Sequence, residues 1–413
     1  MLSFVQNWFA SPANAIGVDF GTDCLRLAQV NRKGTEHDLV AAGGIDVPPH
    51  LRNDIPGRLE FYSKALRDVL TQANFQGRKA IISLPASLMY IQHLRLPKMD
   101  DEALKKALPW ELRGKLPIDP TQALLRHIVA GEVYQDQEPK SEVIVMAARR
   151  DLVDQLIAAA TKAKLDVVGM NTEVKAIIDC FASVFRRQSD IEATTCYLDL
   201  GCNASRAIVA RSGQVLFARI IPVGGEHFSR AVSASLKISL EEAKMLRARL
   251  AAEDTGDRRS KDEFSQGEPQ TPEAAQPSAP AAATASSSQE RDKVEQAYRE
   301  PLAKLIEELG LCKRYYEATF PSKPLDRLIF LGGEARHRVL CHSIARETGI
   351  AAQIGDPLAR IPRDQDGGTE SGIDRKLSQP AWAVAVGLSM GPSEGSGSTV
   401  QGSVKTEPAT AKS

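Results

Sequence analysis

Hydrophobic residues occur along the chain in short runs and in stretches with an apolar residue at every third or fourth position. Short runs bounded by Gly, Pro and small polar residues predict strands, and the longer spacing predicts amphipathic helices. The predicted strands cover 16–30, 38–47, 80–84, 88–96, 142–148, 165–168, 214–221 and 326–331. The predicted helices cover 60–73, 150–163, 172–187 and 291–318, with further helices that begin near Asp100, after Pro222 and at Ser239.

The segment after Asp100 combines a helix signal with a helix breaker. Asp100 is a suitable N-cap, and leucines recur at every fourth position from 104 to 116. Pro109 lies inside this pattern, and its ring and missing N–H predict a kink or an interruption of the helix.

Two segments far apart in the chain repeat one pattern, in which an apolar run is followed by Asp-x-Gly, small or polar residues and a second apolar run. The copies are residues 16–30, with Asp19 and Gly21, and residues 196–210, with Asp199 and Gly201. The pattern predicts two β-hairpins with turns at the glycines. Such turns let backbone N–H groups cradle an anion, and each Asp is placed to hold a cation that bridges phosphates. The pair predicts two similar lobes that grip a nucleotide, with turn capping by the aspartates as the alternative.

The composition limits the class of protein but does not indicate a specific function. The chain has 413 residues, enough for two or more domains with large cores. It carries 52 basic and 52 acidic residues, and this zero formal charge gives no indication of nucleic acid binding. Its six cysteines have no metal-site spacing, which favours buried, reduced thiols in a cytosolic protein.

Neither a membrane span nor a secretory signal is predicted. No apolar stretch is long enough to cross a bilayer, and no Lys or Arg precedes Arg26. Within residues 1–10, Leu2, Val5 and Phe9 have helical spacing. This favours a short helix docked on the protein over a membrane-surface anchor.

Two stretches are predicted to be disordered. Residues 253–290 and 391–413 are rich in small, polar and proline residues and poor in large apolar ones. Such segments cannot bury enough surface to offset the entropy lost on ordering.

A third glycine turn follows the strand near residue 330. Residues 327–336 predict a strand that runs into Gly332 and Gly333 and then into a helix. Paired glycines can lie flat against an adenine or a ribose, although a plain strand–helix turn has the same pattern. The order of hairpin, helix, hairpin, helical insert, Gly-Gly turn and closing helix resembles that of the actin-like ATPase superfamily.

Within that superfamily the sequence resembles the type IV pilus assembly protein PilM family, which is similar to the division protein FtsA. The resemblance covers the chain from Ile16 to about Met390. Besides the nucleotide motifs, it rests on residues 94–104, Trp110 with Glu111, Leu116 with Pro117, 213–225, 314–316 and 382–388.

The resemblance implies an α/β fold: a bilobed actin-like ATPase (ribonuclease H-like) fold with an FtsA-like inserted subdomain. Lobe one would comprise residues 16–80 and 169–192, with 81–168 as the inserted subdomain and candidate partner-binding region. Lobe two would comprise residues 195–225 and 326–390, with 226–325 as a helical insert that contains the disordered loop.

The resemblance also implies contacts to ATP and Mg²⁺. Asp19 and Asp199 would hold Mg²⁺ through water. Glu173 stands where related ATPases keep a carboxylate that orients the attacking water; an exposed acid favoured by the helix dipole is the alternative. The expected nucleotide contacts are Gly21, Thr22, Asp23, Cys24, Arg26, Gly201, Cys202, Asn203, Gly224, Gly225, Lys244, Arg247, Gly332, Gly333 and Glu334.

Two residues depart from the family pattern at these sites. Asp23 places a negative charge in the loop that should face phosphate, and Lys244 stands where the family favours an acid that meets the ribose. Both departures bear on the affinity for nucleotide.

The function implied is that of a cytoplasmic ATP-binding scaffold of a type IV pilus or related secretion machine, peripheral to the inner membrane. Its partner would be the cytoplasmic tail of a single-pass inner-membrane protein, PilN in the family, bound between lobe one and the inserted subdomain through a strand edge. ATP would close the lobes and so shift the populations of the conformations of this groove. Leu88, Trp110 and Leu116 are the candidate lining residues, with core packing as the alternative.

Two other functions stay open. A sugar or acetate kinase of the same superfold would need a carboxylate base beside the γ-phosphate, and only Asp23 and Glu173 stand near the loops. An FtsA-like membrane-associated filament protein would be favoured by a C-terminal amphipathic helix, a pattern that residues 391–413 lack. The sequence leaves the rate of ATP hydrolysis and self-association open.

Overall fold

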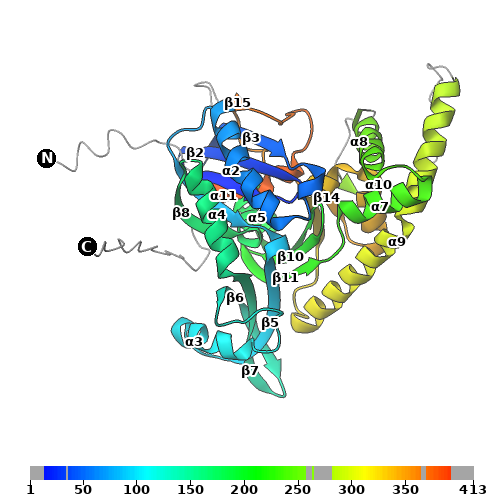
Figure 1. Ribbon diagram of the computed structural model, residues 1–413. Coiled ribbons are helices and arrows are strands. Elements are labelled where there is room, and N and C mark those ends of the chain that lie inside the picture. Colours follow the sequence, from blue (N-terminus) through cyan, green and yellow to red (C-terminus); the bar gives the residue numbers. More distant parts are fainter. Residues whose placement is uncertain (1–13, 34–35, 257–262, 265–280, 364–368, 392–413) are drawn as a thin grey trace, which may run out of the picture.

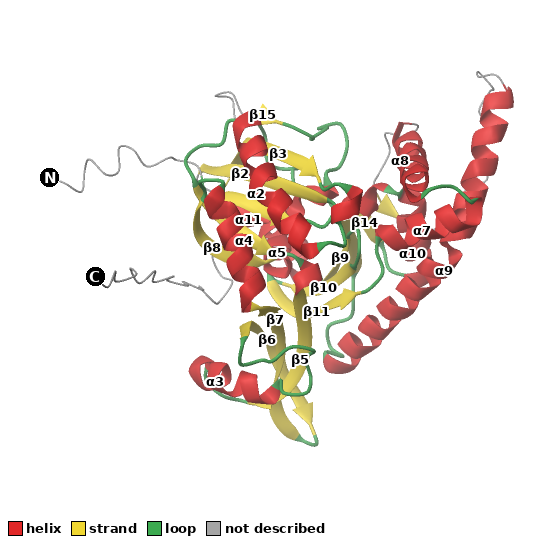
Figure 2. Ribbon diagram, in the orientation of Figure 1, coloured by secondary structure: helices red, strands yellow, loops and turns green. Residues whose placement is uncertain are grey.

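The computed structural model describes residues 14–33, 36–256, 263–264, 281–363 and 369–391. Two six-stranded sheets with helices around them form the main body, and a three-stranded sheet projects from it (Figures 1 and 2). We call the parts built on the large sheets lobe one and lobe two, and the projecting part the inserted subdomain. The predicted α/β, bilobed architecture is confirmed.

The sheet of lobe one has the order β15-β3-β2-β1-β4-β8. Strands β1, β2 and β3 form an antiparallel meander, and β15 pairs with β3 in parallel at one edge. Strands β4 and β8 extend the sheet in parallel on the other side of β1. The strands are β1 (Ile16–Phe20), β2 (Cys24–Lys33), β3 (Glu36–Asp46), β4 (Lys79–Leu84), β8 (Asp166–Thr172) and β15 (Thr369–Glu370).

Two pairs of helices pack on lobe one. Helix α2 (Ile55–Gln72) buries an apolar face, and α4 (Arg150–Lys162) packs against this helix. The carbonyl of Lys162 accepts a hydrogen bond from Arg67 of α2 at 2.7 Å. Helices α5 (Glu173–Val184) and α11 (Ala383–Met390) form the second pair. A Cβ on Gly387 would lie 1.9 Å from the Ala176 carbonyl oxygen, and one on Gly17 would lie 2.0 Å from the Ala385 oxygen, so α11 fits closely between α5 and β1 only because both positions are glycine.

Lobe two repeats this arrangement. Its sheet has the order β11-β10-β9-β13-β14-β12: an antiparallel meander of β9, β10 and β11, then β13 and β14 in parallel, and β12 antiparallel to β14 at the edge. The strands are β9 (Thr195–Leu200), β10 (Ser205–Arg211), β11 (Gln214–Ile221), β12 (Glu263–Phe264), β13 (Arg327–Leu331) and β14 (Ala352–Ile354). The helices are α6 (Gln188–Glu192), α7 (Gly225–Leu236), α8 (Leu240–Gly256), α9 (Ala281–Thr319) and α10 (Arg338–Thr348).

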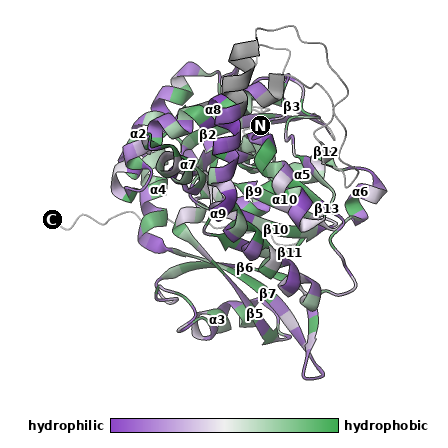
Figure 3. Cartoon of the chain, turned by 90° about the vertical axis from the view of Figure 1, so that its right-hand side faces the viewer, coloured by the Kyte–Doolittle hydropathy of each residue, from purple (hydrophilic) through white to green (hydrophobic). Residues whose placement is uncertain are grey.

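The long helix α9 has one apolar face. Val294, Tyr298, Leu305, Leu309 and Tyr316 recur at helical spacing and are all buried. Figure 3 shows hydrophobic residues along the strands of the main body and many hydrophilic residues on α9. The helix thus covers lobe two with one side and faces solvent with the other.

The inserted subdomain has a small core of its own. Its sheet has the order β5-β7-β6, and leucines of α3 pack against Leu94, Val143 and Val145. The elements are β5 (Met89–Pro97), α3 (Asp101–Glu111), β6 (Ala123–Gln135) and β7 (Glu138–Arg149).

Glu142 on β7 joins this subdomain to lobe two. Its Oε1 accepts hydrogen bonds from His93 Nδ1 at 2.9 Å and from the Tyr315 hydroxyl of α9 at 2.6 Å. His93 Nε2 lies 3.0 Å from the carbonyl oxygen of Ala218 on β11. Burial raises the pKa of Glu142, but the hydrogen bonds from His93 and Tyr315 outweigh it and hold the pKa below its usual value. The carboxylate therefore ties β5, β7, α9 and, through His93, β11 together.

The structure corrects several predicted boundaries. Because β4 runs to Leu84 and α4 packs on α2, the inserted subdomain spans about 85–149 rather than 81–168. Strand β15 pairs with β3 and α11 packs on β1, so residues 369–370 and 383–390 belong to lobe one rather than lobe two. Strand β6 was not predicted, and α3 ends at Glu111, two residues after Pro109.

The predicted disorder of 253–290 is wrong at both ends. Helix α8 continues to Gly256, β12 pairs with β14, and α9 begins at Ala281. Residues 257–262 and 265–280 lie outside the described part of the chain, as do the predicted N-terminal helix and all but Gly391 of the 391–413 tail. No helix in the described ranges has both the length and the hydropathy needed to cross a membrane.

Candidate functional site

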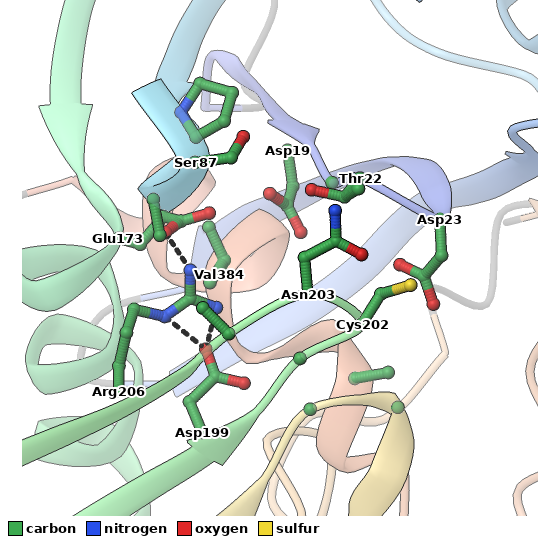
Figure 4. A pocket seen from close by; sticks show the side chains of 18 of the residues that line it. Asp19, Thr22, Asp23, Ser87, Glu173, Asp199, Cys202, Asn203, Arg206 and Val384 are labelled. Carbon is green, nitrogen blue, oxygen red and sulfur yellow. Dashed lines mark hydrogen bonds and ion pairs between the residues drawn. The ribbon is translucent and has the colours of Figure 1, made fainter. Parts of the chain in front are cut away.

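One cleft brings together the turns of the two predicted hairpins and the Gly332–Gly333 turn. It has an empty volume of about 650 Å³, open solvent included, and residues of both lobes line it (Figure 4). The predicted residues that line it are Asp19, Gly21, Thr22, Asp23, Arg26, Glu173, Asp199, Gly201, Cys202, Asn203, Gly332 and Gly333. Residues that sequence reasoning missed are Phe20, Pro85, Ala86, Ser87, Ala204, Arg206, Pro380, Ala381, Ala383 and Val384.

The two hairpin turns are built in the same way. A Cβ on Gly21 would lie 2.5 Å from the Cys24 carbonyl oxygen, and a Cβ on Gly201 would lie 2.7 Å from that of Ala204. Both turns therefore close tightly only with glycine at that position. Both predicted hairpins are confirmed by the strand pairing.

The register of each hairpin places an Arg opposite the Asp. Asp19 pairs with Arg26 across β1 and β2, and Asp199 pairs with Arg206 across β9 and β10. Each Arg follows its Asp by seven residues in the sequence. The repeat could therefore have identified Arg206, which occupies the position that corresponds to Arg26.

In lobe one the two charges do not meet. Asp19 is 6% exposed and its Oδ1 accepts a hydrogen bond of 3.3 Å from the Ser83 hydroxyl. Burial raises the pKa of Asp19 to about 6, against the opposing charges of Arg26 and Arg206. Within the described ranges, no hydrogen bond or ion pair engages the Arg26 guanidinium, which lines the cleft.

In lobe two the charges are tightly paired. The Nε and Nη2 groups of Arg206 donate to Oδ2 of Asp199, with the Nε hydrogen bond at 2.9 Å, and Nη1 donates to Oε2 of Glu173 (Figure 4). The Arg206 side chain is 11% exposed and each carboxylate 4%. Arg206 thus joins the second hairpin to the start of α5.

Glu173 is the first residue of α5, directly after the N-cap Thr172, whose hydroxyl accepts from the Lys175 amide at 3.2 Å. The residue is 3% exposed, so the alternative of a solvent-exposed acid at a helix start is wrong. Burial raises the pKa of Glu173 to about 8, against the attraction of Arg206. The Glu173 carboxylate faces the cleft, as that of a residue that positions a water would. In this structure, however, the carboxylate is paired with the Arg206 guanidinium.

The residues predicted for the adenosine side form a separate cluster. Arg247, 3% exposed, donates to the Tyr298 hydroxyl at 2.7 Å and the Gly225 carbonyl at 3.0 Å, and pairs with Glu334. Burial raises the pKa of Glu334, but Arg247 outweighs it and holds the pKa below its usual value. A Cβ on Gly225 would lie 2.0 Å from the Glu334 carboxylate, so that side chain covers Gly225.

The remaining predicted contacts also have protein partners. Lys244 pairs with Glu226 at 3.0 Å, and a Cβ on Gly224 would lie 2.6 Å from the carbonyl oxygens of Gly201 and Cys202. Gly224, Gly225, Lys244, Arg247, Glu334 and the buried Cys24 therefore lie outside the cleft lining. The structure brings together the phosphate-side residues and separates most of the adenosine-side ones.

Asn203 joins the two lobes at the cleft. Its side-chain amide donates to Oδ1 of Asn53 at 3.0 Å, which links the second hairpin turn to lobe one. Its own Oδ1 is buried and has no hydrogen-bond partner among the described residues. This acceptor is available to a donor within the cleft.

The three predicted partner-binding residues have different surroundings. Leu88 is buried in the main core, whereas Leu116 packs against the small core of the inserted subdomain. Trp110 is 65% exposed, and Arg113 stacks on its ring at 3.9 Å from the centroid. The core-packing alternative therefore holds for Leu88, while Trp110 is exposed and Leu116 is partly buried.

The donor set supports Mg²⁺ at Asp19 but not at Asp199. Magnesium prefers carboxylate oxygens and keeps several of its waters. Asp19 lines the cleft, and its one hydrogen-bond partner in the part of the chain that the structure describes is the Ser83 hydroxyl. For Asp199, one oxygen is held by Arg206 and the other lies 2.4 Å from where a Cβ on Gly332 would be. In the described ranges no three acidic, His or Cys side chains gather into a metal site.

Comparison with known proteins agrees with this architecture. The structure is similar to that of the "PilM-PilN type IV pilus biogenesis complex", with a TM-score of 0.70, 18% identity and coverage of 92% of this chain and 98% of that one. It also matches the ethanolamine utilization protein EutJ from Carboxydothermus hydrogenoformans, with a TM-score of 0.48, 14% identity and coverage of 92% and 90%. The likeness to the first of these structures concerns the fold.

The family matches are more specific. The model of the cell division protein FtsA matches residues 196–387, which cover most of lobe two and the first part of α11. The model of the type IV pilus assembly protein PilM matches residues 17–253, more than half of the chain, and includes both hairpins and the inserted subdomain. The chain therefore belongs to the type IV pilus assembly protein PilM family, with an actin-like ATPase fold.

Proposed function

We propose that this protein is an ATP-binding, actin-like scaffold of type IV pilus assembly. The observation that carries the proposal is the single cleft onto which both hairpin turns and the Gly332–Gly333 turn open. Backbone N–H groups in such turns bind phosphate oxygens, and glycines allow the phosphates to come close. Membership of the PilM family supports the assignment to pilus assembly.

In this proposal the phosphates lie between residues 21–23 and 201–203. The guanidinium of Arg26, which has no partner in the described ranges, offsets the negative charge that Asp23 brings to the first turn. The unpartnered Asn203 Oδ1 accepts from a donor on the nucleotide or its water shell. Asp19 would hold Mg²⁺, which when bound neutralises phosphate charge.

The adenosine side requires a rearrangement. Glu334 covers Gly225 and is paired with Arg247, so the predicted adenosine contacts do not line the cleft in this conformation. A base placed beside Gly225 would displace the Glu334 side chain. We infer that nucleotide binding moves Glu334 and η4 (Gly333–Arg336), which begins directly at the Gly332–Gly333 turn.

The partner in this proposal is the cytoplasmic tail of a PilN-like inner-membrane protein, because the structural neighbour is a PilM–PilN complex. The inserted subdomain is the proposed docking region, with the exposed Trp110 as an anchor. The hydrogen bonds among Glu142, His93 and Tyr315 couple the inserted subdomain to lobe two, so that closure of the lobes moves β5 and β7 with β11. The chain would then be held at the inner membrane by its partner.

Calorimetric titration of ATP into the purified protein tests the nucleotide site. We expect one site per chain in the presence of Mg²⁺ and about tenfold weaker binding in Asp19→Asn, because one carboxylate ligand to the hydrated metal is lost. The matched control is Asp154→Asn, an exposed aspartate on α4 away from the cleft. Absence of ATP binding in the wild type would overturn the proposal.

Binding of a synthetic peptide with the sequence of the PilN-like tail tests the partner. Its affinity is measured by fluorescence anisotropy with and without Mg·ATP, in the wild type and in Trp110→Ala. We expect at least fivefold weaker binding in the variant, since truncating an aromatic anchor typically costs more than 1 kcal/mol. Met245→Ala, an exposed apolar side chain on lobe two, is the control. Equal peptide affinities in all three proteins would place the tail elsewhere.

A further inference from the structure

Arg206 is held by two carboxylates that come from different parts of the fold. Asp199 belongs to the strand before the second hairpin turn, and Glu173 to the first turn of α5. The guanidinium uses Nε and Nη2 on Asp199 and Nη1 on Glu173 (Figure 4). The two contacts therefore involve separate edges of the group, and either can be released without the other.

The Asp199 contact positions the side chain. Asp199 lies directly opposite Arg206 in the antiparallel pair β9–β10, and Gly332 packs on its second oxygen. A carboxylate enclosed in this way is fixed in place. By contrast, Glu173 lines the cleft itself, so its contact with Nη1 is the one that a ligand can reach.

A phosphate oxygen is a suitable replacement for the Glu173 carboxylate. Guanidinium groups bind phosphate and carboxylate with the same planar geometry, and such charge-assisted bonds are strong in a poorly solvated site. Arg206 lies on the cleft beside Ala204, Cys202 and Asn203 of the second phosphate turn. A terminal phosphate that reaches Nη1 would satisfy the Arg206 guanidinium and release Glu173.

We propose that Arg206 binds the terminal phosphate of a nucleoside triphosphate, with Asp199 as its positioning residue and the Glu173 carboxylate as the group that the phosphate displaces. The inference rests on the proposed nucleotide site and adds a means of distinguishing triphosphate from diphosphate. It also gives lobe two a protein cation at the place where Asp199 would otherwise meet Mg²⁺. Release of Glu173 by the terminal phosphate then couples the identity of the nucleotide to the start of α5.

The test compares ATP and ADP affinities, by calorimetry in Mg²⁺, in the wild type and in Arg206→Gln. We expect Arg206→Gln to lose about 10- to 100-fold in ATP affinity, the range for one charge-assisted hydrogen bond, and less than about threefold in ADP affinity. The ATP affinity of Arg206→Lys should lie between those of the wild type and Arg206→Gln. An ammonium group keeps the charge but lacks the second edge with which the guanidinium contacts a second acceptor. Arg211→Gln, at the far end of the same strand and outside the cleft lining, should behave as the wild type.

A second variant covers the case in which Arg206→Gln does not fold, since it leaves two buried carboxylates without their cation. Glu173→Gln has the same shape and removes the competing charge. We expect its ATP affinity to rise about threefold or more and its ADP affinity to stay within about twofold. An unchanged or lower ATP affinity in Glu173→Gln would mean that the contact is only structural.

Failure of the inference can be distinguished from failure of the proposal on which it rests. A wild type that binds neither ATP nor ADP overturns both. A wild type that binds both nucleotides, with an ATP-to-ADP ratio that Arg206→Gln and Glu173→Gln leave unchanged, overturns only the role of Arg206. An equal loss for ATP and ADP in Arg206→Gln also overturns that role, because a terminal-phosphate contact cannot act on ADP.

Discussion

The two hairpins have the same strand register and turn geometry, yet their charges are arranged differently. In β1–β2, Asp19 and Arg26 stand opposite each other without a hydrogen bond or ion pair, and within the described ranges the Asp19 carboxylate accepts from the Ser83 hydroxyl alone. In β9–β10, Asp199 and Arg206 are paired, and Glu173 joins them. A repeated sequence therefore determines the backbone in both places, while the neighbours that the fold brings in decide which charges are free.

The difference follows from what packs beside each hairpin. Beside the first, β4 contributes Ser83, a neutral donor. Beside the second, the start of α5 contributes an acid, and Gly332 lies against one oxygen of Asp199 while the other oxygen accepts from Arg206. In the described part of the chain, the acid and the Arg of the first hairpin thus have no ion-pair partner, whereas the Arg of the second hairpin is held by two carboxylates.

The largest effect should come from the glycine that encloses Asp199. Gly332 has φ +83, and a Cβ there would lie 2.3 Å from the Leu200 oxygen and 2.4 Å from Asp199 Oδ1. We expect Gly332→Ala to lower the free energy of unfolding by about 4 kcal/mol or to prevent folding, since overpacking adds to backbone strain. Gly213→Ala, at φ +75 with no atom within 4 Å, should cost only the strain, about 1–2 kcal/mol. Chemical denaturation measures both, and equal losses would contradict the enclosure of Asp199.

The second prediction compares the two aspartates directly. Asp199→Asn removes one partner of a buried ion pair, which should cost about 3 kcal/mol of stability. Asp19→Asn removes a buried charge that has no cation in contact, and should leave stability unchanged or raise it by up to about 1 kcal/mol at pH 7. Denaturation of both variants at one pH tests the contrast. The prediction is contradicted if the two substitutions lower the free energy of unfolding by the same amount.

A smaller effect is expected in the pH dependence of stability. Burial raises the pKa of Asp19 from 3.8 to about 6. The folded protein therefore holds the Asp19 proton more tightly than the unfolded chain does. The resulting contribution to the free energy of unfolding is present below pH 4 and is lost as the pH rises through about 6. The free energy of unfolding of Asp19→Asn relative to the wild type should rise by about 2 kcal/mol between pH 4.5 and pH 7.5. A difference that stays flat or falls over this interval would contradict a raised pKa.

The sequence predicted what depends on local pattern. Both hairpins, their glycine turns and the helix cap at Asp100 lie where the pattern placed them, because each depends on neighbouring residues. Arg206 was overlooked although its spacing from Asp199 copies that of Arg26 from Asp19. Its contact with Glu173 depends on a helix that lies before the second hairpin in the chain, and no local pattern encodes that contact.

Misassigned regions share the same cause. Helices α4 and α11 follow the inserted subdomain and lobe two in sequence but pack on lobe one through side chains and glycines that only the fold brings together. Strand β6 has a mixed burial pattern, unlike β9, whose residues are all buried, and it was not predicted. The adenosine-side residues were placed by resemblance, whereas Arg247 and Glu334 satisfy each other in this conformation.

A crystal structure of the protein with Mg²⁺ and a non-hydrolysable ATP analogue would show directly whether the cleft holds a triphosphate. We expect phosphates between residues 21–23 and 201–203, with Nη1 of Arg206 on the terminal phosphate and Glu173 released. A nucleotide bound away from this cleft, or a terminal phosphate bound while Arg206 still contacts Glu173, would contradict this assignment.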